Sequence, residues 1–215
     1  MMPEHILLRG KGEAKLTKKE LEYFYIDNSY GGNQDWFLDF MMHLGGCAAV
    51  TACDSAIYLA RNFQIEHIYP FDKNHLTKKE YIKFSRIMKP FLRPRRGGVD
   101  RLELYTDGFA VYLKQQGVKN LFMEPFSGEH SAEAAWDRIV MQIDQGLPIP
   151  YLLLRHQRPE LNDYVWHWFL LIGYEEEEKR VKTVTYGEAQ WLDFQLLWDT
   201  GETPKGGIIL YRGIE

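Results

Sequence analysis

Apolar residues recur three or four positions apart through most of the first 147 residues, which is the spacing of amphipathic helices. Helix start signals precede several of these stretches. Thr17 and Thr77 are each followed three residues later by a glutamate, and Ser131 stands ahead of the most regular stretch. Stop signals follow at Pro90 and Gly146. The pattern therefore predicts a turn-rich passage over residues 93–100 and helices over residues 16–25, 47–63, 77–89, 107–117 and 131–146.

The pattern changes after Pro150 to short β-branched and aromatic runs that polar links separate. These runs predict strands over residues 151–156, 164–174, 180–186 and 206–213. Because the links are short, neighbouring strands should be antiparallel. We expect an α+β fold with a site between two lobes. The predicted organisation is a single domain over residues 1–215, with a helical lobe over about 1–147 and a β-rich lobe over about 148–215.

The composition agrees with a globular domain and excludes several functional classes. The chain has 215 residues, of which 45% are hydrophobic and 14% aromatic, enough to fill a large core. Its net charge of −4 argues against general nucleic-acid binding, which needs excess positive charge. No stretch approaches the roughly eighteen apolar residues of a membrane span, and the first residues lack the apolar run of a secretory signal.

Two cysteines, Cys47 and Cys53, lie in one predicted helix. Their six-residue offset puts the side chains on different faces, so we expect two free thiols in a reducing compartment, the cytoplasm. Gly45 and Gly46 interrupt the pattern just before Cys47 and place its thiol in the first helical turn, where the helix dipole favours an anion. Cys47 is therefore a candidate nucleophile that should ionise readily. The alternative, which we keep for Cys53, is a small core residue.

One of the seven histidines, His167, lies inside an otherwise apolar predicted strand. Buried imidazole nitrogens need hydrogen-bond partners. His167 is either a core histidine bonded to a carbonyl or a general base beside a nucleophile. Strand alternation puts it on one face with Phe169, and puts Trp166 and Trp168 on the other. The sequence has no CxxC, HExxH or carboxylate–histidine cluster, so we expect no metal site.

These features follow one another in a known order. A glutamine comes first, and GGCAAVTA (45–52) then opens a helix after a Gly-rich turn. A later strand carries HWFLLIGY (167–174), and the next one ends in TYG (185–187). This order over residues 31–187 resembles the papain-like cysteine peptidase superfamily. It is more similar to the bacterial branch that includes the bacteriocin-leader (double-glycine) peptidases than to papain. The resemblance implies a papain-like fold and thiol chemistry without a cofactor.

The resemblance also implies roles for individual residues. Cys47 would be the nucleophile and His167 the base that takes its proton. The family has an Asn or Asp on the next strand to orient the imidazole. Matching TYG to the family's Ser-Trp-Gly puts Val184 at that position, which is a departure from the family pattern. The nearby polar substitutes are Thr185, which we take as the third group, Thr183 and Glu188.

A glutamine amide precedes the cysteine in the family and stabilises the developing oxyanion. Gln34 precedes Cys47 by a longer interval than the family shows, and a helical turn between them could bring its amide back over the thiol. Asn33 is a near-equivalent candidate, and either amide could instead bond nearby backbone. The arginines of RPRRGG (93–98) could hold a ligand carboxylate or phosphate, or form a solvated turn. The aromatic residues of the expected substrate cleft, which could equally belong to the core, are Trp36, Trp166, Trp168 and Tyr186.

We therefore expect a cysteine hydrolase, a peptidase or amidase, that acts on a peptide or amide through a thioester intermediate. The missing Asn or Asp favours an alternative, a catalytically decayed module of the same fold that binds a peptide or small ligand in the inter-lobe cleft. A third reading is a regulatory protein whose Cys47 senses oxidants. The sequence predicts no membrane or nucleic-acid partner and leaves the oligomeric state open.

Overall fold

The computed structural model of the chain describes residues 18–95 and 97–214. In this part of the chain, seven strands form one antiparallel sheet in the order β4-β9-β5-β6-β7-β8, and β1 adds to β6. Its strands are β1 (Lys18–Glu20), β4 (Phe122–Ser127), β5 (Ile149–Leu153), β6 (His167–Glu175), β7 (Arg180–Thr185), β8 (Glu188–Asp193) and β9 (Gly207–Arg212). A separate ribbon pairs β2 (Tyr25–Ile26) with β3 (Ser29–Tyr30).

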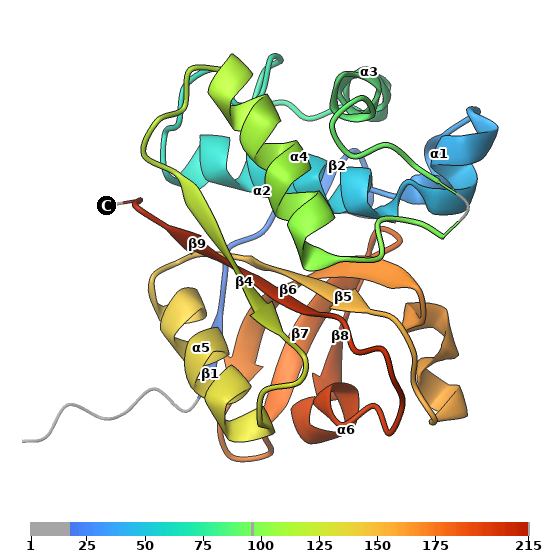
Figure 1. Cartoon of the computed structure of the whole chain (residues 1–215). Helices are drawn as coiled ribbons and strands as arrows, with labels where there is room; N and C mark the ends of the chain where they lie inside the picture. The colour runs from blue at the N-terminus through green and yellow to red at the C-terminus, as the bar shows by residue number, and fades with distance from the viewer. Residues whose placement is uncertain (1–17, 96, 215) are drawn as a thin grey trace, which may run out of the picture.

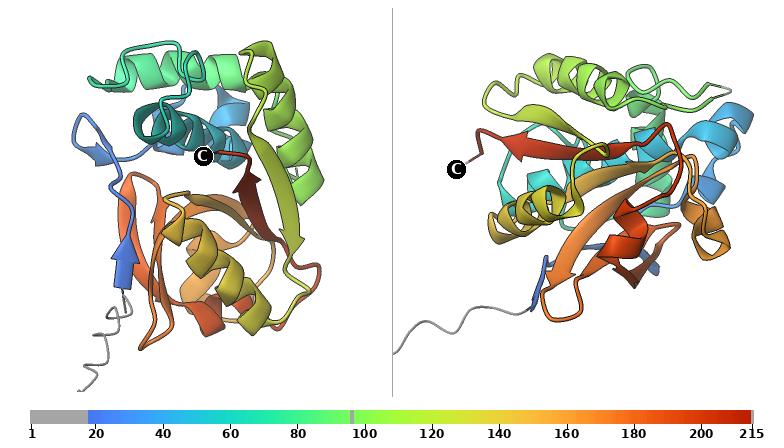
Figure 2. Two further views of the ribbon diagram at one scale, coloured as in Figure 1. Left: turned by 90° about the vertical axis from the view of Figure 1, so that its left-hand side faces the viewer. Right: turned by 60° about the horizontal axis from the view of Figure 1, so that its bottom comes forward.

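Helices cover both faces of this sheet (Figure 1). The α-helices are α1 (Phe40–Gly45), α2 (Cys47–Asn62), α3 (Lys78–Met88), α4 (Leu102–Gln115), α5 (Ala132–Asp144) and α6 (Phe194–Trp198), and short 3-10 turns occur at η1 (Gln34–Trp36) and η2 (Pro159–Tyr164). Helices α1 to α4 gather on one side, whereas α5 and α6 lie on the other (Figure 2). The α+β class predicted from the sequence is confirmed.

The helix signals in the sequence act as expected where a helix forms. The Thr77 hydroxyl accepts a hydrogen bond from the Glu80 backbone N–H, and α3 ends at Met88, ahead of Pro90. The Ser131 hydroxyl caps α5 in the same way, and Gly146 follows it with a φ of +79°. These local signals therefore set the ends of α3 and α5.

Other predicted elements differ from the structure. Residues 18–20 of the expected helix 16–25 form β1 instead, because pairing with Gly173–Glu175 outweighs their local helix signal; residues 16 and 17 lie outside the described part. Strand β4, inside the predicted helical lobe, pairs along its whole length with β9. Strand β8 was not predicted. The helix expected over 107–117 begins earlier, at Leu102.

The site lies where α2 meets β6. Thirteen of the sixteen residues of α2 are buried, and small side chains such as Ala48, Ala49 and Ala52 let the sheet approach its backbone. Trp168 of β6 stacks on Tyr105 of α4, with ring centres 4.6 Å apart and an angle of 21° between the rings. This contact packs α4 against the same face of the sheet as α2. The packing of α2 against β6 places the start of the helix beside the start of the strand (Figure 1).

Within residues 18–95 and 97–214, no helix has the length and apolar character that a membrane span requires. In the same residues, no group of three or more His, Cys, Asp or Glu side chains is arranged to hold a metal ion.

Candidate active site

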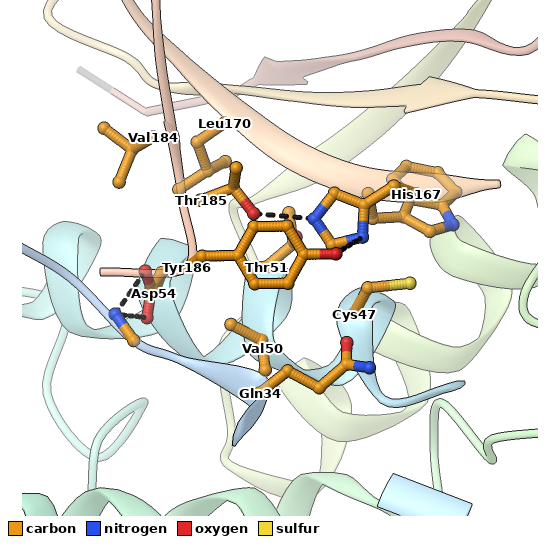
Figure 3. A pocket seen from close by; sticks show the side chains of 12 residues that line it. Gln34, Cys47, Val50, Thr51, Asp54, His167, Leu170, Val184, Thr185 and Tyr186 are labelled. Atoms are coloured by element: carbon orange, nitrogen blue, oxygen red, sulfur yellow. Dashed lines mark hydrogen bonds between the residues drawn. The ribbon is translucent and has the colours of Figure 1, made fainter. Parts of the chain in front are cut away.

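One pocket brings together the candidate residues from three distant parts of the sequence. Its wall includes Gln34 from η1, Cys47 from the first turn of α2, His167 from the start of β6, and Thr185 with Tyr186 from the end of β7. Figure 3 shows these side chains around one space, with the tyrosine ring lying over the imidazole. The sequence-predicted nucleophile, base, third group and oxyanion residue therefore line the same pocket.

The imidazole of His167 is held by two hydroxyl groups. Its Nε2 lies 2.6 Å from Oγ1 of Thr185, and its Nδ1 lies 3.4 Å from the Tyr186 hydroxyl. The Tyr186 ring also stacks on the imidazole, with centres 4.6 Å apart and an angle of 5°. With a proton on Nε2 donated to Thr185, Nδ1 carries no proton and accepts the longer hydrogen bond from the Tyr186 hydroxyl. Thr185 thus orients the ring through a neutral hydroxyl.

A tight turn between β7 and β8 puts Tyr186 over the imidazole. Tyr186 and Gly187 have φ values of +52° and +78°, so the hairpin closes through a two-residue turn with both residues in the left-handed region. A positive φ is uncommon for a tyrosine and is held by surrounding contacts. The Tyr30 backbone N–H donates to the Gly187 carbonyl at 2.8 Å, and Asn33 Nδ2 donates to the Tyr186 carbonyl at 2.9 Å.

The prediction that the Cys47 thiol ionises readily is wrong for this structure. Burial raises the pKa of the thiol, and its exposed fraction is only 5%. The backbone N–H group of Trp168 on β6 lowers the pKa, and so do those of Ala48 and Cys47 at the helix start, as predicted for the last two, but burial is the larger effect.

Burial also lowers the pKa of His167 to about 4. A thiol whose pKa is raised and an imidazole whose pKa is lowered are both neutral near pH 7. The resting site is therefore a neutral pair rather than a thiolate–imidazolium pair.

Gln34 reaches the pocket because α1 folds back between it and Cys47. Its Nε2 donates to the His43 carbonyl of α1 at 2.5 Å. Among the described residues, its buried Oε1 has no hydrogen-bond partner. The helical turn expected between Gln34 and Cys47 is therefore present. Asn33 points elsewhere, since its side chain caps η1 and bonds the Tyr186 carbonyl.

A wider groove of about 520 Å³ opens from Cys47 and His167 toward solvent. Trp166 and Leu44 line it and are 47% and 60% exposed. Trp166 has a φ of +54°, lies just before β6 and so does not follow the strand alternation predicted for it. Arg95, from the RPRRGG loop, also lines the groove. Half-exposed apolar side chains beside a candidate nucleophile form a surface that a substrate can contact.

The other two aromatic residues of the predicted cleft, Trp36 and Trp168, pack against neighbouring groups, and of these two only Trp168 also lines the pocket. The Trp168 indole is buried and donates to the Val99 carbonyl at 2.5 Å. Trp36 packs edge-on against Tyr81, with ring centres 5.5 Å apart, and is not among the residues that line the pocket or the groove.

The other candidates for the third group do not contact the imidazole. Thr183 is buried and bonds the Tyr164 hydroxyl at 3.0 Å and the Gln190 carbonyl at 3.2 Å. Glu188 is exposed at the start of β8. Val184, which the family pattern aligns with the Asn, pairs with Leu170 and is buried.

Among the pocket-lining residues that the sequence did not predict, Asp54 is the one that carries an ionisable side chain. Its carboxylate is 3% exposed and accepts hydrogen bonds from the hydroxyls of Tyr23 and Tyr81 and from the Gly32 backbone. Burial raises its pKa to about 6. A lone Asp inside the small and apolar run AVTACDSAIYLA (49–60) was the available signal, because a carboxylate is rarely placed on a helix packed on all sides.

Comparisons with known proteins add little to this geometry. No family model matches the chain, and no curated protein matches it in sequence. Among solved structures, the chain is similar to the crystal structure of the Pseudomonas avirulence protein AvrPphB. The identity is 10%, the TM-score is 0.39, and the match covers 86% of this chain and 96% of that one. A likeness this weak carries no argument, and the functional proposal depends on the site itself.

Proposed function

We propose that the chain is a papain-like cysteine hydrolase, a peptidase or amidase, with Cys47 as nucleophile and His167 as general base. The observation that carries this proposal is that Cys47, at the start of α2, shares a pocket with His167, whose Nε2 is bound by Thr185 at 2.6 Å. That contact leaves Nδ1 as the nitrogen that can accept the thiol proton. The order of the motifs, which resembles that superfamily, agrees with these roles.

The proposed reaction begins from the neutral pair. The Cys47 sulfur attacks the substrate carbonyl as its proton passes to His167 Nδ1, which forms a tetrahedral oxyanion and an imidazolium. The imidazolium then gives that proton to the leaving amine as the carbon–nitrogen bond breaks, and a thioester remains on Cys47. Water, deprotonated by the same nitrogen, attacks the thioester and releases the acid together with the free thiol.

Three groups in this proposal stabilise charge or orient the reactants. In this proposal the backbone N–H groups at the start of α2 and the second N–H of Gln34 Nε2, whose first N–H is donated to the His43 carbonyl, are the donors to the oxyanion. The Gln34 Oε1, which lacks a partner among the described residues, can accept an N–H of the substrate. Thr185 stabilises the imidazolium less than a carboxylate would, because its hydroxyl is neutral.

The finer assignments belong to the same proposal. They are the resemblance to the bacterial bacteriocin-leader branch, a peptide or amide substrate, and action in the cytoplasm. The motif order over residues 31–187 and the two free cysteines support them.

Trapping with an electrophilic peptide probe, a peptidyl vinyl sulfone, tests the proposed function. We expect one adduct per chain, located on Cys47 by mass spectrometry of the digested protein. Cys47→Ala should abolish the adduct, Cys53→Ala should retain it, and His167→Ala should slow its formation by roughly a hundredfold. Labelling of Cys53 at the same rate as Cys47 would refute the proposal.

Two observations favour a second candidate, a non-enzymatic module that binds a peptide in the groove. They are the neutral third group and the neutral resting pair. This candidate predicts that the probe binds reversibly, equally well to the wild-type chain and to Cys47→Ala, without covalent capture.

A further inference from the structure

The buried carboxylate of Asp54 binds the backbone of the loop that carries Gln34. The Gly32 backbone N–H donates to both of its oxygens, at 3.2 Å and 3.0 Å. Two hydroxyls complete the cluster, with Tyr23 at 2.8 Å and Tyr81 at 2.7 Å. A Cβ on residue 32 would lie 1.9 Å from the Tyr81 hydroxyl oxygen, so only glycine lets the loop approach this closely. Gln34 follows two residues later.

The same loop also holds the turn beside His167. Tyr30 and Asn33 donate hydrogen bonds to the carbonyls of Gly187 and Tyr186. Tyr186 in turn stacks on the imidazole of His167. One segment, residues 30–34, therefore connects the Asp54 carboxylate with the amide of Gln34 and with the turn that covers the base.

Asp54 and Cys47 share one side of α2, because seven residues are close to two helical turns. Both line the same pocket (Figure 3). The helix that carries the nucleophile therefore also carries the group that fixes the distance between Gln34 and that nucleophile.

We propose that Asp54 is a positioning residue, which holds the loop of Gln34 over Cys47 so that the amide meets the oxyanion. This inference rests on the proposed function, because it assigns Asp54 a role in the same acylation step. All donors on the carboxylate are neutral, and the four contacts use the full acceptor capacity of an ionised group. An asparagine has the same size but replaces one of the two acceptor oxygens by an N–H₂ group. That group cannot accept the hydrogen bonds that this oxygen receives.

The first test compares two reactions of the Cys47 sulfur in Asp54→Asn. Acylation by a peptide thioester passes through an oxyanion, whereas alkylation by iodoacetamide does not. We expect acylation to slow by roughly tenfold to a hundredfold and alkylation to change by less than about twofold, because Cys47 and His167 stay in place. A parallel loss of both rates would overturn the inference, since it would indicate general damage to the site.

A double-mutant cycle with Gln34→Ala tests whether Asp54 acts through that amide. If it does, Asp54→Asn should slow acylation much less in the Gln34→Ala background than in the wild-type background. Fully additive effects on the acylation rate would contradict the inference.

Hydrogen exchange gives a readout that needs no activity. Asp54→Asn should increase amide exchange in peptides covering residues 30–37 and leave α5 unchanged. Unchanged protection of residues 30–37 would overturn the inference. If the wild-type chain forms no acyl-enzyme, the proposed function fails, while exchange still tests the anchoring of the loop.

Gln142→Met provides a matched control. The Gln142 side chain is a buried clamp on α5 that bonds the backbone N–H and carbonyl of Tyr211, at 2.8 Å and 3.0 Å. Its loss should lower stability without changing the ratio of acylation to alkylation. If Asp54→Asn does not fold, Tyr23→Phe removes a single bond to the carboxylate, and a smaller fall in the same ratio is expected.

Discussion

The two cysteines lie on the same helix, α2, and are buried to nearly the same extent, yet their surroundings differ. Cys53 is fully buried in the core, and burial followed by the charge of Asp54 raises its pKa well above the usual value. Cys47 is 5% exposed, lies at the helix start and lines a pocket that contains an imidazole. The difference shows that the chemistry available to a thiol depends on the side chains that a neighbouring element places beside it. For Cys47 this side chain is the imidazole of His167, at the start of β6.

The same packing explains why the Cys47–His167 pair is neutral at rest. The packing that brings His167 to Cys47 also excludes water from both groups, which disfavours the charged form of each.

The largest effect should come from replacing each of the two cysteines by alanine in separate variants. Cys47→Ala should lower turnover of an acyl substrate by at least about a thousandfold, because it removes the nucleophile. Cys53→Ala should leave turnover within about twofold and lower the free energy of unfolding by about 1 kcal/mol, because it only leaves a small cavity. Steady-state kinetics and urea unfolding measure the two effects. A Cys47→Ala chain with wild-type turnover would contradict the account.

Thr185→Val should reduce kcat by roughly tenfold, because it removes the hydroxyl that orients the imidazole. Thr185→Ser is the matched control and should retain most of the activity. KM should change little in either variant, since Thr185 reaches the substrate only through His167. Equal kcat values for the Val and Ser variants would remove Thr185 from the site.

Trp166→Ala should raise KM by roughly fivefold and leave kcat near the wild-type value, because the indole lines the groove beside the reacting pair. Phe122→Ala is the matched control, since Phe122 is also an exposed aromatic residue but lies on β4. Steady-state kinetics with a peptide substrate should therefore separate the two variants. A rise in KM of the same size for both would contradict the groove assignment.

The smallest effect is expected in the wild-type chain, where two opposing contributions make its stability depend little on pH. His167, whose pKa falls from 6.5 to about 4, stabilises the fold above pH 6.5, and this contribution is lost on acidification toward pH 4. Asp54, whose pKa rises from 3.8 to about 6, contributes in the opposite sense, because its stabilisation is present below pH 4 and lost as pH rises to 6. The two contributions therefore largely cancel between pH 4 and 6.

Single variants should remove this cancellation. Relative to wild type, Asp54→Asn should lose about 2 kcal/mol of unfolding free energy between pH 6.5 and 4.5. His167→Gln should gain stability over the same interval. Urea unfolding at four pH values measures both slopes, and parallel curves for all three chains would contradict the burial of these groups.

The sequence predicted those parts of the molecule that depend on local signals. The Thr77 and Ser131 caps gave the starts of α3 and α5, and the glycines before Cys47 gave the start of α2. His167 was recognisable because an imidazole in an apolar strand needs partners. The α+β class followed from the change in pattern after Pro150.

The missed features all depend on contacts between distant residues. The sequence of Lys18–Glu20 predicts a helix start, but these residues pair with β6, more than 150 residues away. Thr185 could not be ranked above Thr183 without the turn at Tyr186 and Gly187, which places only Thr185 against the imidazole. The contact between Asp54 and Gly32 joins a helix to a loop, and no periodicity in the sequence records it.

The most direct test of the central claim is a pre-steady-state burst with 4-nitrophenyl acetate, followed by acid quenching and peptide mapping. We predict a burst of one equivalent of nitrophenol per chain, with the acetyl group on the peptide that contains Cys47 and on no peptide that contains only Cys53. Release of nitrophenol without a burst, or acetyl groups spread over lysines with Cys47 unmodified, would contradict the claim that this thiol forms an acyl-enzyme.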